Sequence, residues 1–215
     1  MLRWRAVVFD LDGTLIDTIP LIVASHRHAV QTVLGRDLPD EVLRSGIGRP
    51  LIEQMAVFDP DRAQDLYDSY RVWNHANTAA LLGRFDGVDE VLRELDRAGA
   101  AVGVATSKSR DAVDLAFSIQ PPAITFGAVV TVEDTTQHKP DPEPVLTAIA
   151  RLGAEPAGAA YVGDAPYDIA AARAAGCGAV GVTWGVASAD VLREAGADEV
   201  AETPGELAAI LVGAA

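Results

Sequence analysis

The stretch "VVFDLDGTL", residues 7–15, determines how the rest of the chain is read, because an apolar run ends there in two closely spaced carboxylates. Residues 7–9 predict a buried strand, and Asp10, Asp12 and Gly13 come at its end. Side chains of an extended strand alternate between two faces, so Asp10 and Asp12 lie on the same side. Gly13 permits a tight turn with exposed backbone N–H groups that suit an anion. The stretch therefore predicts a ligand site at the carboxyl end of a strand, where parallel α/β sheets bind their ligands.

Two neighbouring carboxylates repel each other, so a cation between them is the economical explanation of this pattern. Oxygen-only ligands favour Mg²⁺. One alternative is an ordinary acidic turn. A calcium loop of the EF-hand type is excluded, because it needs glycine at its sixth position and glutamate at its twelfth. Here the glycine is fourth, counted from Asp10, and position twelve is Leu21. We therefore predict a metal and phosphate site at this turn.

The composition is that of a globular chain. Its 215 residues are 49% hydrophobic and 22% charged, which suits one large domain or a core with a modest insert. The net charge of −14 and the lack of a basic stripe argue against a nucleic-acid partner. No run approaches ~18 uncharged apolar residues, so no membrane span is expected. A single cysteine, Cys177, and no signal-peptide pattern favour the cytoplasm.

From residue 88 onward, helix and strand signals alternate, which predicts a doubly wound parallel sheet covered on both faces. The helices end in glycine or open with proline, as helix boundaries commonly do. We expect strands over 101–107, 126–132, 159–164 and 178–185, and helices over 89–100, 110–118, 142–153, 167–176 and 189–196. A short strand at 198–202 and a helix over 204–213 complete the α/β part.

Residues 18–82 differ, because their apolar residues recur at helical spacing and no good strand lies between them. We expect an all-helical cap over residues 16–82, inserted into an α/β catalytic core made of residues 1–15 and 83–215. The hinges are expected near residues 15–20 and 82–87.

Further polar residues follow the later strands and should converge on the same sheet edge. Thr106 and Ser107 end one strand and could bind phosphate through their hydroxyls, or simply cap the next helix. Lys139 precedes a helix; a solvated loop lysine is the alternative, but the chain has only two lysines against 15 arginines. Asp164 ends a strand and can hold the metal. Asp168 either orients the waters of that metal or caps its helix.

These residues together have the logic of phosphoryl transfer. The Asp10 carboxylate can attack phosphorus and form an acyl phosphate. Asp12 can protonate the leaving oxygen and then take a proton from the hydrolytic water, which is worth roughly 10²–10⁴ in rate. Mg²⁺, Lys139 and the Thr106 hydroxyl neutralise the phosphoryl oxygens.

The order DLDGT, hydrophobic-TS, KP and GDxxxD, with a helical insert after the first motif, resembles the haloacid dehalogenase superfamily over essentially the whole chain. The resemblance implies a Rossmann-like core, with Asp10 as nucleophile, Asp12 as acid and base, and Thr106 and Lys139 on the phosphate. It implies Mg²⁺ held by Asp10, Asp164 and the Asp12 backbone carbonyl, with Asp168 in support. The segments "GIGRPL", "YRVWNH" and "HKPDPEPV" resemble the phosphoglycolate phosphatase and bacterial inorganic pyrophosphatase branch.

The cap is expected to select the substrate, a small phosphorylated molecule such as inorganic pyrophosphate or phosphoglycolate. Arg49, in "SGIGRPL", either contacts the leaving group or is an exposed loop charge. A phosphomutase of the same superfamily is the first alternative function. A non-catalytic phosphoaspartate signalling module is the second, although such modules place the acidic pair and the phosphoacceptor on different strands.

Overall fold

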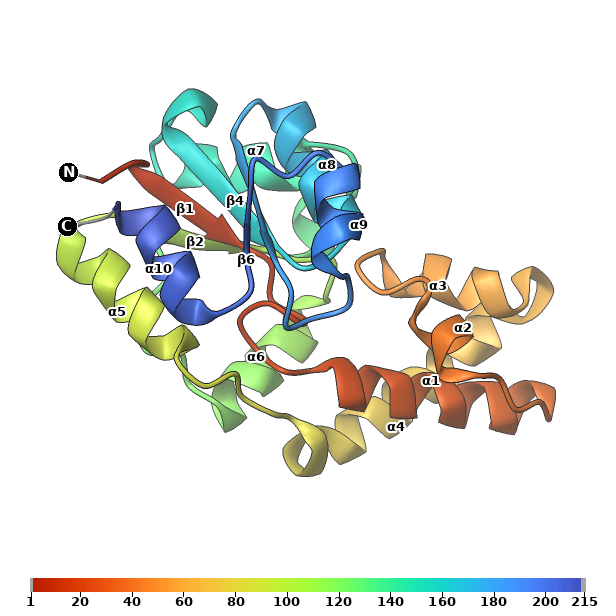
Figure 1. Ribbon diagram of the computed structural model, residues 1–215. Helices are drawn as coiled ribbons and strands as arrows, with labels where there is room; N and C mark the ends of the chain where they lie inside the picture. The colour runs from red at the N-terminus through yellow and green to blue at the C-terminus, as the bar shows by residue number, and fades with distance from the viewer. Residues whose placement is uncertain (1, 214–215) are drawn as a thin grey trace.

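The computed structural model describes residues 2–213, and its α/β part is built on a parallel sheet (Figure 1). The strand order is β3-β2-β1-β4-β5-β6, so β1 lies near the centre between β2 and β4. Val8 in β1 pairs with Gly103 on one side and Tyr161 on the other. This confirms the expected doubly wound α/β core. The strands are β1 Ala6–Phe9, β2 Ala101–Ala105, β3 Ala128–Val130, β4 Ala159–Gly163, β5 Gly178–Val182 and β6 Glu199–Ala201.

Helices cover both faces of the sheet, because the strands are apolar on both sides. Ala6 and Val8 pack toward the face covered by α7, α8 and α9, whereas Val7 and Phe9 pack toward α5 and α10. Helix α6 joins the second face through Val113. The helices are α5 Val88–Ala98, α6 Arg110–Ile119, α7 Glu143–Arg151, α8 Pro166–Ala175, α9 Ala189–Glu194 and α10 Pro204–Val212.

Four helices between β1 and α5 form the helical insert, which lies beyond the carboxyl ends of the strands (Figure 1). They pack around a core of their own, in which Leu43, Met55 and Leu66 are fully buried. His26 and Tyr70 belong to this interior as well. The helices are α1 Ile19–Leu34, α2 Asp40–Arg44, α3 Leu51–Phe58 and α4 Ala63–Leu81, with a 3₁₀ turn at Pro60–Arg62.

The two segments that connect the insert to the sheet pair with each other. Gly83 donates its N–H to the carbonyl of Asp17 at 2.8 Å, and the two residues form an isolated antiparallel bridge. Gly83 lies so close to Asp17 that a Cβ would sit 3.0 Å from its side chain. The insert therefore leaves and re-enters the α/β part at neighbouring positions, inside both expected hinge regions.

The structure differs from the sequence expectations in the extent of individual elements. Helix α2 lies inside the segment expected to be helical, although its five residues show no apolar period of their own. The strand expected over 126–132 is confined to Ala128–Val130. It ends there because the Asp134 carboxylate accepts hydrogen bonds from the backbone N–H and the hydroxyl of Thr131, which turns the chain into a 3₁₀ helix.

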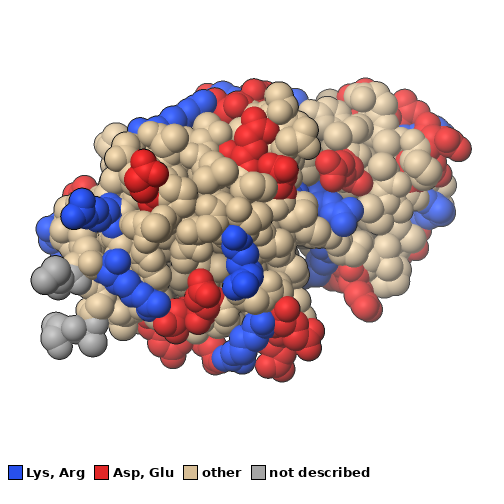
Figure 2. Space-filling model, turned by 90° about the horizontal axis from the view of Figure 1, so that it is seen from above, with Lys and Arg blue, Asp and Glu red and all other residues tan. Residues whose placement is uncertain are grey.

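The surface carries charges of both signs. On the face shown in Figure 2, acidic side chains are interspersed with basic ones and no continuous basic stripe is seen. None of the helices in residues 2–213 combines the length and hydropathy that a bilayer crossing requires.

Candidate active site

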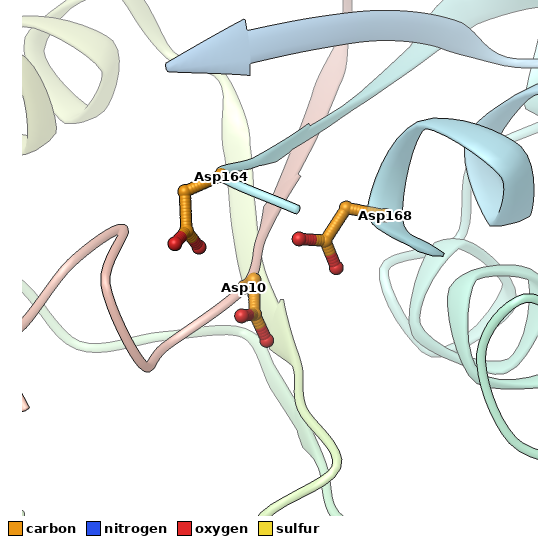
Figure 3. Close-up of side chains that lie close together, drawn as sticks. All are labelled: Asp10, Asp164 and Asp168. Carbon is orange, nitrogen blue, oxygen red and sulfur yellow. The ribbon is translucent and has the colours of Figure 1, made fainter. Parts of the chain in front are cut away.

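Three carboxylates from two strand ends and one helix meet at the edge of the sheet that faces the insert (Figure 3). Asp10 follows β1, Asp164 follows β4, and Asp168 lies in the first turn of α8. All three are buried, and each offers an oxygen within 4.8 Å of the others. Parallel strands bring their carboxyl ends to one edge, so residues 154 positions apart in sequence become neighbours.

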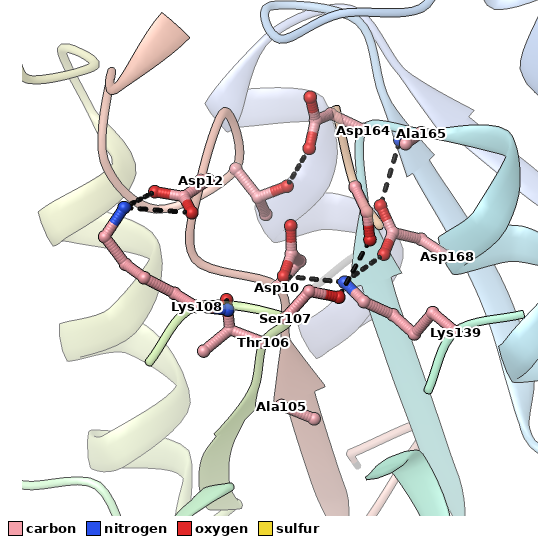
Figure 4. Close-up of polar contacts among 12 residues, drawn as sticks. Asp10, Asp12, Ala105, Thr106, Ser107, Lys108, Lys139, Asp164, Ala165 and Asp168 are labelled. Atoms are coloured by element: carbon pink, nitrogen blue, oxygen red, sulfur yellow. Dashed lines mark hydrogen bonds and ion pairs between the residues drawn. The ribbon is translucent and has the colours of Figure 1, made fainter. Parts of the chain in front are cut away.

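Lys139 supplies the positive charge inside this cluster. Its ammonium donates to Asp10 Oδ1 at 2.8 Å, to Asp168 Oδ1 at 2.7 Å and to the Tyr161 hydroxyl at 3.2 Å (Figure 4). The Lys139 side chain is only 1% exposed. Tyr161 in turn donates to the carbonyl of Ala105 at 2.7 Å, which ties the lysine to β2. The alternative of a solvated loop lysine is therefore excluded, because Lys139 is a buried ion-pair partner.

Burial dominates the electrostatics of the cluster. It raises the pKa of Asp10 to about 7; Asp168 and Asp12 act in the same direction, while Lys139 opposes them. Burial also raises the pKa of Asp164 well above its ordinary value, with Asp168 and Asp10 adding to the effect. Burial alone would lower the pKa of Lys139, but the carboxylates of Asp10 and Asp168 raise it well above the usual range. The cluster therefore has more buried acid than one lysine neutralises.

The orientation of Asp164 is fixed by its surroundings. Thr14 donates its hydroxyl to Asp164 Oδ1 at 2.9 Å, and the backbone N–H of Val186 donates to Oδ2 at 2.8 Å. Gly13 and Gly185 leave room for the carboxylate. A Cβ on Gly13 would lie only 2.4 Å from Asp164 Oδ2, and one on Gly185 only 2.0 Å. The requirement for glycine at residue 13 is therefore steric as well as conformational, since its φ is +79°.

The donor set fits a hard divalent cation. Only oxygen ligands are present and they are buried. A bound cation would offset the burial and the charge repulsion that raise the pKa values of Asp10 and Asp164. Asp168 is engaged through both oxygens, because Lys139 occupies Oδ1 and the backbone N–H of Ala165 donates to Oδ2 at 3.0 Å. Asp168 thus holds Lys139 and caps α8.

The Asp12 side chain points toward Lys108 (Figure 4). The Lys108 ammonium lies 2.8 Å from Asp12 Oδ1 and 3.1 Å from Oδ2. Both side chains are mostly buried and line the cleft between the sheet edge and the insert. Both lysines of the chain are therefore bonded to the two aspartates of the opening motif. The scarcity of lysine was the available signal for Lys108, but nothing in the sequence joined it to Asp12.

The two hydroxyl residues after β2 have different surroundings. Thr106 is 3% exposed and lines the cleft, and its Oγ1 accepts from the backbone N–H of Lys108 at 3.2 Å. Ser107 donates its hydroxyl to the carbonyl of Gly48, in the insert, at 2.8 Å. Both residues line the cleft, and Ser107 in addition joins the sheet edge to the insert.

The insert contributes Arg49 to the cleft. Its guanidinium lies 4.7 Å from the centre of the Tyr167 ring, at the start of α8, and the Arg49 backbone carbonyl accepts from Gln54 Nε2 at 2.7 Å. Gly48, with φ +103°, fits between this loop and α8, since a Cβ there would be 3.2 Å from Ala165 and Tyr167. The sequence did not indicate Gln54 or Tyr161. Gln54 holds the Arg49 backbone and Tyr161 contacts Lys139, and no local sequence pattern predicts such contacts.

A further contact between insert and core lies on the other side of the cleft. Arg71 of α4 forms an ion pair with Asp111 at the start of α6 and donates to the Tyr67 hydroxyl at 3.2 Å. Arg49, in contrast, has no carboxylate partner among residues 2–213, so its charge is directed to the cleft and to the Tyr167 ring.

A phosphoryl group needs an in-line nucleophile, positive charge on its oxygens and a proton for the group that leaves, and this cleft presents side chains suited to all three. The fold and the site thus define a hydrolase of phosphoric groups. A family model described as haloacid dehalogenase-like hydrolase matches residues 7–182. The chain belongs to this family and is a phosphatase.

Individual relatives and solved structures are similar to this chain over most of its length. The chain is 37% identical to the pyrophosphatase PpaX of Bacillus velezensis over 190 residues, which cover 88% of each chain. A solved hydrolase from Pseudomonas syringae superposes with a TM-score of 0.84 at 25% identity, over 94% of this chain and 95% of that one. A solved structure described as a predicted phosphoglycolate phosphatase from Haemophilus somnus shares the fold, with a TM-score of 0.89 at 22% identity, over 98% and 99% of the two chains.

Proposed function

We propose that the protein is a Mg²⁺-dependent phosphohydrolase that works through an aspartyl-phosphate on Asp10. The observation that carries the proposal is the position of the Asp10 carboxylate, which lies at the cleft and is bonded to the buried Lys139 beside Asp164. Residues 1–15 and 83–215 form the catalytic core in this proposal, and residues 16–82 form the cap.

In this proposal each step is assigned to a residue of the cleft. Asp10 attacks phosphorus, the bond from phosphorus to the leaving oxygen breaks, and Asp12 gives that oxygen a proton. Asp12 then takes a proton from the water that hydrolyses the acyl phosphate, which releases phosphate and restores Asp10. Lys139 and the Thr106 hydroxyl hold the phosphoryl oxygens throughout.

Asp10, Asp164 and the backbone carbonyl of Asp12 would hold Mg²⁺, and Asp168 would support the site through Lys139. When bound, Mg²⁺ supplies charge neutralisation at the transferred phosphoryl group and brings it into line with Asp10. The Ser107 hydroxyl would bind the phosphate after leaving the Gly48 carbonyl, to which it donates in this structure.

The substrate is proposed to be small and anionic, with inorganic pyrophosphate the first candidate and phosphoglycolate the second. The insert covers the cleft and contributes Arg49, whose guanidinium can grip a phosphate or carboxylate with two parallel hydrogen bonds. The name of the Bacillus velezensis relative supports pyrophosphate. A phosphomutase shares the same chemistry up to the acyl phosphate and differs in returning the phosphoryl group to a sugar.

Turnover by purified protein tests the proposal. The protein with Mg²⁺ should release phosphate from pyrophosphate or phosphoglycolate, and a phosphomutase would instead convert a sugar phosphate without net release. The control is the Asp10→Asn variant prepared in the same way, which excludes a contaminating phosphatase. Release of phosphate at the same rate by wild type and variant would refute the mechanism.

Arg49→Ala tests the proposed contact with the leaving group. A charge-assisted hydrogen bond is worth roughly 1.5–3 kcal/mol, so the ratio of kcat/KM for pyrophosphate to that for p-nitrophenyl phosphate should fall about 10- to 100-fold. Arg44→Ala, at an exposed position of α2, is the matched control and should keep the wild-type ratio. Equal losses on both substrates would show that Arg49 is structural or contacts the transferred phosphoryl group instead.

A further inference from the structure

Lys108 occupies a position that the phosphoryl-transfer steps above do not use. It comes two residues after Thr106, lines the cleft, and directs its ammonium at both oxygens of Asp12. The side chains of Lys108 and Asp12 are 12% and 17% exposed, so the pair is partly shielded from water yet borders the space where a substrate would lie.

The backbone of Lys108 is fixed, but the position of its ammonium depends on the Asp12 contact. The Lys108 N–H donates to Thr106 Oγ1 at 3.2 Å, and its carbonyl accepts from the N–H of Val132 at 3.1 Å. Among residues 2–213, Asp12 is the one hydrogen-bond acceptor of its ammonium. A four-carbon stem with a fixed base can move the ammonium by several ångströms at little cost, because lysine is a flexible point charge.

The contact with Lys108 conflicts with the role of Asp12 in the proposed reaction. A carboxylate that accepts from one ammonium through both oxygens has neither oxygen directed at a leaving group. Asp12 must be released from Lys108 before it can meet the leaving oxygen at hydrogen-bond distance. Whatever releases it has to offer the ammonium another anionic partner, since an unpaired charge in a partly buried cleft is costly.

The substrate itself can provide that partner. A leaving group with its own phosphate or carboxylate would place a negative charge beyond the scissile bond, on the side of Asp12. Among the other cleft cations, Arg71 is paired with Asp111, and Arg49, the proposed contact from the insert, lies over the Tyr167 ring. Lys108 is the cation already in contact with the group that must protonate the leaving oxygen.

We propose that Lys108 is a specificity-determining residue whose ammonium passes from Asp12 to the anionic leaving group of the substrate and thereby frees Asp12 to act on the scissile bond. This inference rests on the proposed phosphohydrolase function. No covalent bond to Lys108 forms or breaks; the ammonium keeps its three protons and changes only its hydrogen-bond acceptor. The released Asp12 carboxylate takes up a proton from water in the cleft before it protonates the leaving oxygen. A neutral leaving group offers no such exchange and leaves Asp12 bound to Lys108.

A matched pair of substrates isolates this effect. Phosphoglycolate and 2-hydroxyethyl phosphate carry the same phosphoryl group on a two-carbon alcohol, and differ in having a carboxylate or a neutral hydroxymethyl group at the far end. The wild type should favour phosphoglycolate. In Lys108→Met, the ratio of kcat/KM for phosphoglycolate to that for 2-hydroxyethyl phosphate should fall about 10- to 100-fold, the loss expected for one charge-assisted hydrogen bond.

Two further variants complete the experiment, all measured with saturating Mg²⁺. Lys108→Arg keeps a cation at the site and should retain most of the wild-type ratio. Arg97→Met makes the same change of net charge at an exposed position of α5, and should keep the ratio unchanged. Thermal melting of each variant shows whether it is folded.

The outcomes separate this inference from the function on which it rests. A fall in the ratio with Lys108→Met, rescued by Lys108→Arg, supports the exchange. Equal losses on both substrates would overturn it, because Lys108 would then only position Asp12. No loss on either substrate would also overturn it, because Lys108 would then contribute nothing to turnover. Both results would leave the proposed phosphohydrolase function intact. Failure of the wild type to turn over any phosphate ester or pyrophosphate would overturn the proposed function, and this inference with it.

Discussion

Acidification should destabilise the helical insert through a single histidine, His26. This residue of α1 is completely buried, with the Phe58 ring of α3 and the Tyr70 ring of α4 centred 5.3 and 5.2 Å away. Nδ1 lies 2.7 Å from the carbonyl of Leu43, which a neutral ring satisfies by donating, and Nε2 has no hydrogen-bond partner among residues 2–213. Burial lowers the pKa of His26 to about 4 from 6.5, opposed in part by the Leu43 carbonyl and by the neighbouring Gln54 side chain.

The sign and size of the effect follow from this shift. Below pH 6.5 the histidine of the unfolded chain takes up a proton, while that of the folded protein does so only near pH 4, so the unfolded state binds more protons and stability falls with acidification. The contribution is fully retained above pH 6.5. The loss reaches about 3 kcal/mol by pH 4, which is a large part of the 5–15 kcal/mol typical of a domain.

Urea unfolding followed by circular dichroism between pH 7 and pH 4 measures this loss. Carboxylates also titrate in this range, so the quantity of interest is the difference between wild type and His26→Asn, which cannot be protonated there. That difference should change by about 3 kcal/mol across the range, with the variant less dependent on pH. His75→Asn, at an exposed position of α4, is the control and should follow the wild type. A change below about 1 kcal/mol would refute the assignment of a neutral, buried His26.

Asp10→Asn should abolish turnover while leaving the melting temperature close to that of the wild type, since the amide keeps the shape but cannot attack phosphorus; activity within tenfold of wild type would contradict the covalent mechanism. Replacing Mg²⁺ by Ca²⁺ should inhibit phosphate release, because Ca²⁺ takes more ligands at longer distances and loosens the alignment of Asp10, and full activity after exhaustive chelation would exclude a metal role for Asp164. Lys139→Met leaves the buried carboxylates of Asp10 and Asp168 without their lysine, and in chelator it should cost about 3–5 kcal/mol in the free energy of unfolding by urea titration; a loss below about 1 kcal/mol would mean that the pair is not desolvated.

The convergence of the core motifs could be predicted because it depends on one rule of topology. Asp10, Thr106 and Asp164 each end a parallel strand, and the carboxyl ends of such strands share one edge wherever the strands lie in the sheet. The helical character of the insert could be predicted for a similar reason, since α1 and α4 are long enough to show an apolar period. The five residues of α2 are too few for a period to appear.

Contacts between insert and core could not be predicted, because they depend on how two separately packed units meet. The hydrogen bond from Ser107 to Gly48 joins residues 59 positions apart, and the ion pair of Arg71 with Asp111 joins residues 40 apart. The pairing of Lys108 with Asp12 depends in the same way on where β1 and β2 place their end loops. Residue type indicated that Arg49 and Lys108 were candidates, but only the packing showed what each of them contacts.

The backbone pair between Asp17 and Gly83 has a consequence for how such proteins diversify. The chain leaves and re-enters the α/β part at these two paired residues, so the whole insert is attached to the core in the same way as a surface loop. Such sites tolerate insertions well. β1 and β2, which the insert separates in sequence, are hydrogen-bonded neighbours in the sheet. Selection can therefore replace or resize the enclosed helices while the sheet edge that carries the acidic cluster stays in place. For protein engineering, the paired residues Asp17 and Gly83 are natural junctions for exchanging the helical insert between relatives.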